Sequence, residues 1–213
     1  MRRSSFLRRT AAALAVALAT LVVQGGAAGA QSTPPAAAAR PAVNAADVHF
    51  MSGMIPHHAQ AVKIAGWAAS HGASPAVVRL CERIVVGQRD EIELMQTWLR
   101  DRGQPVPPAD AMRMRMMHDG VAHDMLMPGM LTDEELARLD RARGPEFDRL
   151  FLAAMIKHHE GAIGMVDQLF ASPGAGQDEV VFRFASDVYA DQTTEIEHMS
   201  KMLAAMSAGE RKP

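Results

Sequence analysis

A pair of adjacent histidines occurs twice in the chain, each time after the same residues. The first copy is Met54-Ile55-Pro56-His57-His58 and the second is Met155-Ile156-Lys157-His158-His159. Every position differs from its partner by 101 residues, and an aspartate precedes each copy at the same distance, as Asp47 and Asp148. Imidazole, thioether and carboxylate groups are common metal ligands, and here they recur at helical spacing. The pattern therefore predicts metal binding, with structural histidines as the competing interpretation.

A second repeat supplies further ligand types. Gln88-x-x-Glu91-Ile92-x-x-Met95 is matched by Gln192-x-x-Glu195-Ile196-x-x-Met199, at an offset of 104 residues. Imidazole suits copper, zinc, iron and nickel, whereas a thioether sulfur favours soft Cu(I). The combination of histidine and methionine therefore points to copper as Cu(I) or Cu(II), with the carboxylates as ligands or as groups that orient the imidazoles.

A methionine-rich segment lies between the two copies. Residues 112–130 contain seven methionines and two histidines. Their spacing is irregular for one buried helical stripe, so we predict a flexible segment with soft ligands, or alternatively an apolar flap over the fold. The candidate metal ligands of the whole chain are His57, His58, His158, His159, Met54, Met155, Asp47, Asp148, Glu91, Glu195, Met95, Met199, Met114, Met117, His118 and His123.

Helices are expected to position the candidate ligands of the two repeats. Capping residues and prolines predict helices over about 44–70, 75–102, 132–144, 145–171 and 178–208, and no strand pattern is apparent. The two repeats are helical hairpins, 44–102 and 145–208, joined by a crossover over 103–144. We therefore predict an all-α four-helix bundle domain over residues 44–208.

Helical geometry separates the two histidines of each pair. At about 100° per residue, His58 and His159 fall on the inward line of their helices. His57 and His158 lie about 60–80° away, at the border of the buried stripe. We therefore expect the second histidine of each pair inside the bundle and the first one at its rim.

The N-terminal residues indicate export. Residues 1–30 combine a basic start with a short apolar run and a small-residue cleavage site, which predicts a signal peptide; residues 31–43 predict a disordered linker. Removing residues 1–30 takes away four of the 22 basic residues, so the remaining chain has a net charge of 18 − 24 = −6. This charge argues against nucleic-acid binding. No other stretch is apolar enough for a membrane span, and a single cysteine excludes an internal disulfide framework.

The doubled motif resembles the domain-of-unknown-function family numbered 305. The shared pattern is Asp-x-x-Phe-x-x-x-Met-Ile-x-His-His-x-x-Ala in both copies, with Pro128-Gly129-Met130-Leu131-Thr132 before the second. The resemblance covers about residues 44–207. It implies a ferritin-like four-helix bundle in an exported, periplasmic or extracellular protein, and a role in copper binding and tolerance.

Three functions compete at this point. The first is copper sequestration or transfer without chemical turnover, with metal ions and an exported metal-handling protein as partners. The second is a ferritin-like oxidase with iron or manganese, since Glu195-x-x-His198 has the spacing of carboxylate di-metal sites. The first repeat has Glu91-x-x-Leu94 instead, so a symmetric di-iron centre is not supported. The third is a structural or interaction module; the sequence leaves the oligomeric state open.

Overall fold

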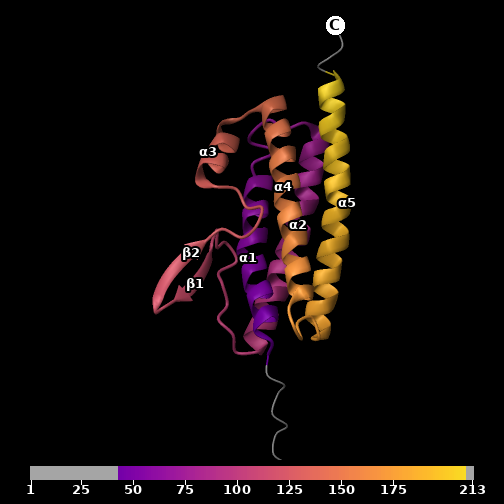
Figure 1. The fold of residues 1–213 in the computed structure, drawn as a ribbon. Helices are drawn as coiled ribbons and strands as arrows, with labels where there is room; N and C mark the ends of the chain where they lie inside the picture. The colour runs from indigo at the N-terminus through magenta and orange to yellow at the C-terminus, as the bar shows by residue number, and fades with distance from the viewer. Residues whose placement is uncertain (1–42, 210–213) are drawn as a thin grey trace, which may run out of the picture. The chain divides into compact units, whose positions relative to one another are not determined.

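Four long helices form the bundle in the computed structural model, which describes residues 43–209 (Figure 1). The expected signal peptide and nearly all of the expected linker lie outside these residues. The elements, in order, are α1 (Ala45–Ala65), α2 (Pro75–Asp101), β1 (Met114–His118), β2 (Val121–Met125), α3 (Asp133–Arg141), α4 (Gly144–Ala171) and α5 (Glu179–Gly209). The predicted all-α four-helix bundle is confirmed. None of the helices within 43–209 is both long and apolar enough to cross a membrane.

Helix starts agree with the capping residues. Asn44 accepts a hydrogen bond from the Ala46 amide, and Ser74 accepts one from the Val77 amide. Thr132 and Glu135 form a reciprocal capping box at the start of α3. The first helix is shorter than expected. Beyond its cap at Gly66, most amides bond to carbonyls three residues back, and the chain continues as turns to residue 72.

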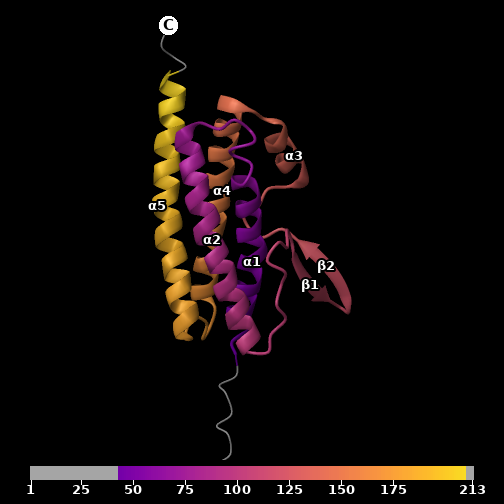
Figure 2. The ribbon, with the colours of Figure 1, turned by 180° about the vertical axis from the view of Figure 1, so that it is seen from behind.

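The two helical hairpins, α1–α2 and α4–α5, meet mainly through α1 and α4 (Figures 1 and 2). Asp47, at the start of α1, accepts a 2.7 Å hydrogen bond from the Gly176 amide in the α4–α5 loop. Asp148, at the start of α4, accepts bonds of 3.1 and 3.2 Å from the Ser74 amide in the α1–α2 loop. Each aspartate therefore fastens the loop of the other repeat, and α1 and α4 run antiparallel.

The absence of strands was a wrong prediction. β1 and β2 form an antiparallel hairpin within the methionine-rich segment. Its turn is Asp119-Gly120, with φ of 52° and 76°, the positive values that a tight two-residue hairpin turn needs. The Asp-Gly pair was the available sequence signal, although one exposed hairpin carries too few apolar residues to show a strand pattern. The hairpin lies beside α1, on the side away from α5 (Figure 1).

Candidate metal centre

Four buried histidines form one continuous row in the middle of the bundle. His57 on α1 and His158 on α4 lie face to face, with ring centroids 3.8 Å apart and ring planes tilted by 41°. His58 is 6.2 Å from His57, and His159 is 6.3 Å from His158. All four side chains have 0% exposure. The two repeats therefore contribute to one centre at the α1–α4 contact rather than to two distant ones.

A glutamate from the neighbouring helix stands at each end of the row. His159 Nε2 donates to Glu195 Oε2 over 2.6 Å. His58 Nε2 lies 2.7 Å from Glu91 Oε2, close enough for an ion pair but without hydrogen-bond alignment. Both glutamate side chains keep about a quarter of their surface in solvent. Such carboxylates fix the orientation of an imidazole and increase its basicity towards a metal at the other nitrogen.

The imidazoles present free lone pairs in a region without water access. His57 Nε2 donates to the Pro128 carbonyl over 3.0 Å, which leaves Nδ1 as the acceptor in the neutral ring. Within residues 43–209, the buried side-chain atoms without a hydrogen-bond partner are His57 Nδ1, His58 Nδ1 and Nε2, His158 Nδ1 and Nε2, His159 Nδ1, Gln88 Oε1 and Gln192 Oε1. Each such group costs roughly 1–3 kcal/mol of stability. A cation bound by these nitrogens would remove part of that cost.

Burial keeps the two central rings neutral. The pKa of His57 and that of His158 lie well below their usual value, mainly because burial removes the hydration of the charged form. The positive charge that neighbouring histidines would carry lowers both pKa values further. A neutral imidazole is the form that binds metal, so these rings are ready as ligands at neutral pH.

The predicted rim position of His57 and His158 was wrong, because the crossover covers that edge. Gln60 on α1 binds the backbone of Leu131 through both of its amide atoms, at 3.0 and 2.7 Å. On α4, Gly161 leaves room for the Pro128 backbone: a Cβ there would lie 2.1 Å from the Pro128 carbonyl oxygen. The segment 128–131 therefore lies across α1 and α4 and closes the row.

Gln60 and Gly161 were missed in the sequence. They occupy equivalent places in the two repeats, since 60 + 101 = 161. The sequence feature that could have revealed their role is the difference between the two repeats at this position. One repeat has a side chain with two hydrogen-bonding groups, and the other has no side chain. The repeat alone could not show that one chain segment uses both positions.

The repeated methionines line the core next to the histidines. Met54, Met155, Met95 and Met199 are all 0% exposed. Met54 is one helical turn before His58, and Met155 is one turn before His159. Met54 and Met95 belong to one apolar cluster, and Met155 and Met199 belong to the other. A metal-ligand role for these four residues stays a prediction.

The aspartates of the motif lie away from the row. Asp47 and Asp148 each precede the inward histidine of their helix by 11 residues, or about 16 Å along the axis. Their carboxylates bind loop amides instead. The structure therefore separates both from the histidine row and gives them a role in fastening loops. His198 is exposed, so the Glu195-x-x-His198 spacing does not direct both side chains into the bundle.

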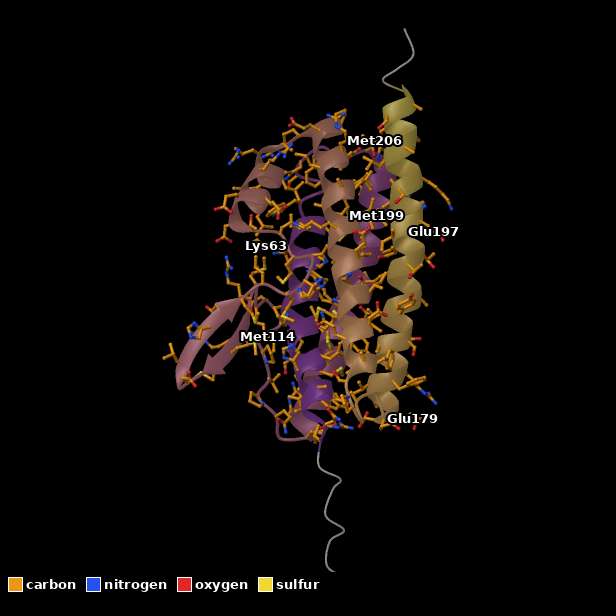
Figure 3. The ribbon with its side chains drawn as sticks, in the orientation of Figure 1. Lys63, Met114, Glu179, Glu197, Met199 and Met206 are labelled. Atoms are coloured by element: carbon orange, nitrogen blue, oxygen red, sulfur yellow. The ribbon has the colours of Figure 1, made fainter. Side chains whose placement is uncertain are left out.

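The candidate metal ligands of the crossover lie partly against the bundle and partly in the exposed part of the β1–β2 hairpin. Met114 is buried against α1, where its sulfur would be 3.3 Å from a Cβ on Gly53 (Figure 3). Met117 is 66% exposed and His123 is exposed. His118 ends β1, where its backbone pairs with Val121. Met114, Met117 and His123 do not join the histidine row, and no cluster of three His, Cys, Asp or Glu side chains is preassembled for a metal in the described part of the chain.

Solved structures of similar sequence share this fold. A protein from Streptomyces coelicolor is 27% identical with a TM-score of 0.63, covering 76% of this chain and 94% of that one. A fragment from Deinococcus radiodurans is 29% identical with a TM-score of 0.61, covering 78% and 99%. CopM in its Cu(I)-bound form is 26% identical with a TM-score of 0.56, covering 75% and 96%. CopM has also been solved with Cu(II), with silver and in the apo form.

Part of the chain is also similar to a viral protein, and most of it matches a known family. The uncharacterized protein L153 of Acanthamoeba polyphaga mimivirus is 32% identical over 56 residues, which span 26% of this chain and 37% of the viral protein. Residues 47–203 match the family described as "Domain of unknown function (DUF305)", to which the Streptomyces and Deinococcus proteins also belong. The match includes both histidine pairs and both aspartates. The chain is therefore a member of the DUF305 family.

Proposed function

We propose that this protein binds copper in the buried histidine row and thereby sequesters or passes on the ion. The observation that carries the proposal is the set of unpartnered Nδ1 atoms on His57, His58, His158 and His159, all fully buried at one helix contact. Without an ion, these groups reduce the stability of the fold. A bound cation is a partner that would satisfy these four unpartnered Nδ1 atoms.

The ligand chemistry favours copper, and Cu(I) above Cu(II). Neutral imidazoles surrounded by apolar side chains suit a monovalent ion, whose charge costs less to bury than that of a divalent one. Met54 and Met155 add thioethers one turn away from the row. CopM, which shares the fold, has been solved with Cu(I), Cu(II) and silver, and this supports the same class of cargo here.

Binding by ligand exchange requires no reaction of the protein. The Glu195 carboxylate holds His159 Nε2, and the Glu91 carboxylate lies 2.7 Å from His58 Nε2. The low pKa of His57 and His158 keeps protons from competing with the ion. A role in copper tolerance outside the cytoplasm follows from the expected signal peptide. The description of the Streptomyces relative as secreted supports this location.

Copper titration of the purified protein tests the proposal. Anaerobic Cu(I) is added in competition with a chromophoric chelator, and bound copper, iron and manganese are measured by elemental analysis. The wild type should take up copper stoichiometrically. The double variant His57→Leu/His158→Leu should lose this binding while keeping its helical circular dichroism, because leucine preserves an apolar, packed contact.

Two exposed histidines provide matched controls. His49 lies on α1 and His198 on α5, and both side chains are exposed. His49→Leu and His198→Leu should leave Cu(I) affinity unchanged. Equal loss of binding in the control variants, or iron or manganese bound in place of copper, would refute the proposed centre.

A further inference from the structure

The hairpin register assigns the residues of the methionine-rich segment to two faces. Met114 pairs with Met125, and Met116 pairs with His123. Side chains alternate along a strand, and directly paired residues lie on the same face. One face therefore carries Met114, Met116, His123 and Met125, and we call it the inner face because Met114 packs on α1. The opposite, outer face carries Arg115, Met117 and Asp124.

Packing explains only part of the inner face. Met114 is buried and Met116 is partly buried against the apolar core, but Met125 is 44% exposed and His123 is exposed. Apolar contact is therefore incomplete at the two residues of β2. The outer face is different, because Arg115 and Asp124 pair across the strands at 3.5 Å and neutralise each other. Three thioethers and one imidazole thus share a face without a charged neighbour from the hairpin itself.

The spacing of these four groups suits a single soft ion. Directly opposite Cβ atoms of an antiparallel pair are about 4.5–5.5 Å apart. Pairs two residues along the strand follow at about 7 Å. Methionine has three rotatable bonds and reaches across such distances. A set of thioethers with one imidazole selects Cu(I) or its analogue Ag(I) over hard divalent cations.

We propose that the inner face of the β1–β2 hairpin is a second binding site for a soft monovalent cation, formed by Met114, Met116, His123 and Met125. It is separate from the buried histidine row and open to solvent through His123 and Met125. The proposal rests on the proposed function only for copper as the natural cargo, whereas the preference for a soft monovalent ion follows from the ligands themselves.

Met114 connects this site to the bundle. Its sulfur and that of Met127 both lie over Gly53 on α1, where a Cβ would be 3.3 and 3.4 Å from them. Met127 donates its backbone amide to the Met130 sulfur over 3.3 Å, and these residues flank Pro128, whose carbonyl binds His57. An ion on the hairpin is therefore adjacent to further soft ligands that lead towards the histidine row.

Methyl NMR of the full chain tests the site. The protein is labelled with ¹³C at the methionine methyl groups, assigned by single Met→Leu variants, and titrated with Ag(I) nitrate in chloride-free buffer. The methyl signals of Met116 and Met125 should shift together and saturate. That of Met117, on the outer face of the same strand, should stay in place.

Variants separate this site from the histidine row. Met116→Leu/Met125→Leu should reduce Ag(I) uptake by about one equivalent while binding at the row persists, and Met117→Leu should reduce nothing. His57→Leu/His158→Leu should leave the hairpin methyl shifts intact. If that variant abolishes all Ag(I) binding, or if Met117 responds as strongly as Met116, the inner-face site is refuted. If His57→Leu/His158→Leu loses the Ag(I) bound at the histidine row but keeps the hairpin methyl shifts, the result supports two separate sites.

Discussion

Replacing His158 with leucine should stabilise the metal-free protein. Both ring nitrogens of His158 are buried without a hydrogen-bond partner, and the side chain is 0% exposed. Removing an unsatisfied buried polar group recovers roughly 1–3 kcal/mol, whereas a swap of similar volume costs less than about 1.5 kcal/mol. Subtracting this cost from the recovery leaves an expected net gain of up to about 3 kcal/mol at pH 7.5.

The gain should increase in acid. The ordinary histidine pKa is 6.5, and burial places that of folded His158 well below this value. Below pH 6.5 the unfolded chain therefore binds a proton that the folded chain does not, and the wild type loses stability as the pH falls. His158→Leu removes this loss at one residue. The difference between variant and wild type should widen by about 1 kcal/mol between pH 7.5 and 5.5.

Chemical denaturation of the apo protein at the two pH values measures both effects, with chelator present in the metal-free samples. A gain of 1 kcal/mol corresponds to a rise in Tm of about 2–4 °C for a domain of this size. His198→Leu, at an exposed position, should change stability by less than about 0.5 kcal/mol. With Cu(I) added, the order should reverse, because the wild type binds the ion and is stabilised by mass action.

Two results would refute this reasoning. The first is an apo His158→Leu protein that is less stable than the wild type by more than about 1 kcal/mol, because unsatisfied nitrogens would then not be the dominant cost. The second is a difference that stays constant between pH 7.5 and 5.5, because His158 would then not be held neutral by burial.

Two further predictions concern the contacts that hold the crossover and the α1–α2 loop in place. Gly161→Ala should destabilise the protein by about 1–3 kcal/mol in denaturant titrations, because the new Cβ would clash with the backbone of the crossover. Gly164→Ala is the control, since a Cβ there meets nothing within 4 Å, and it should stabilise the protein by about 0.5–1 kcal/mol. Asp148→Ala should cost about 1–3 kcal/mol because the Ser74 amide loses its acceptor, while Asp167→Ala, at an exposed place on the same helix, should change stability little.

Local sequence signals determined the helices and their pairing. Asn44, Ser74 and Thr132 cap α1, α2 and α3, and such caps can be predicted from the sequence because their interaction is made within four residues. The repeat offsets of 101 and 104 identified two hairpins, and two amphipathic hairpins bury their apolar faces best in a bundle. The doubled histidines drew attention to the residues that form the buried row, because the repeated pair is visible in the sequence itself; their role as metal ligands stays a prediction.

The tertiary structure decided which groups meet. A helical wheel placed His57 at a border, because a wheel represents one helix and cannot include the crossover that Gln60 and Gly161 hold over it. The same limit applied to Asp47, whose partner is an amide 129 residues further along the chain. Spacing in sequence gives the direction of a side chain from its own helix. The partner that receives the side chain is set by the packing of distant segments, which here brings the two histidine pairs into one row.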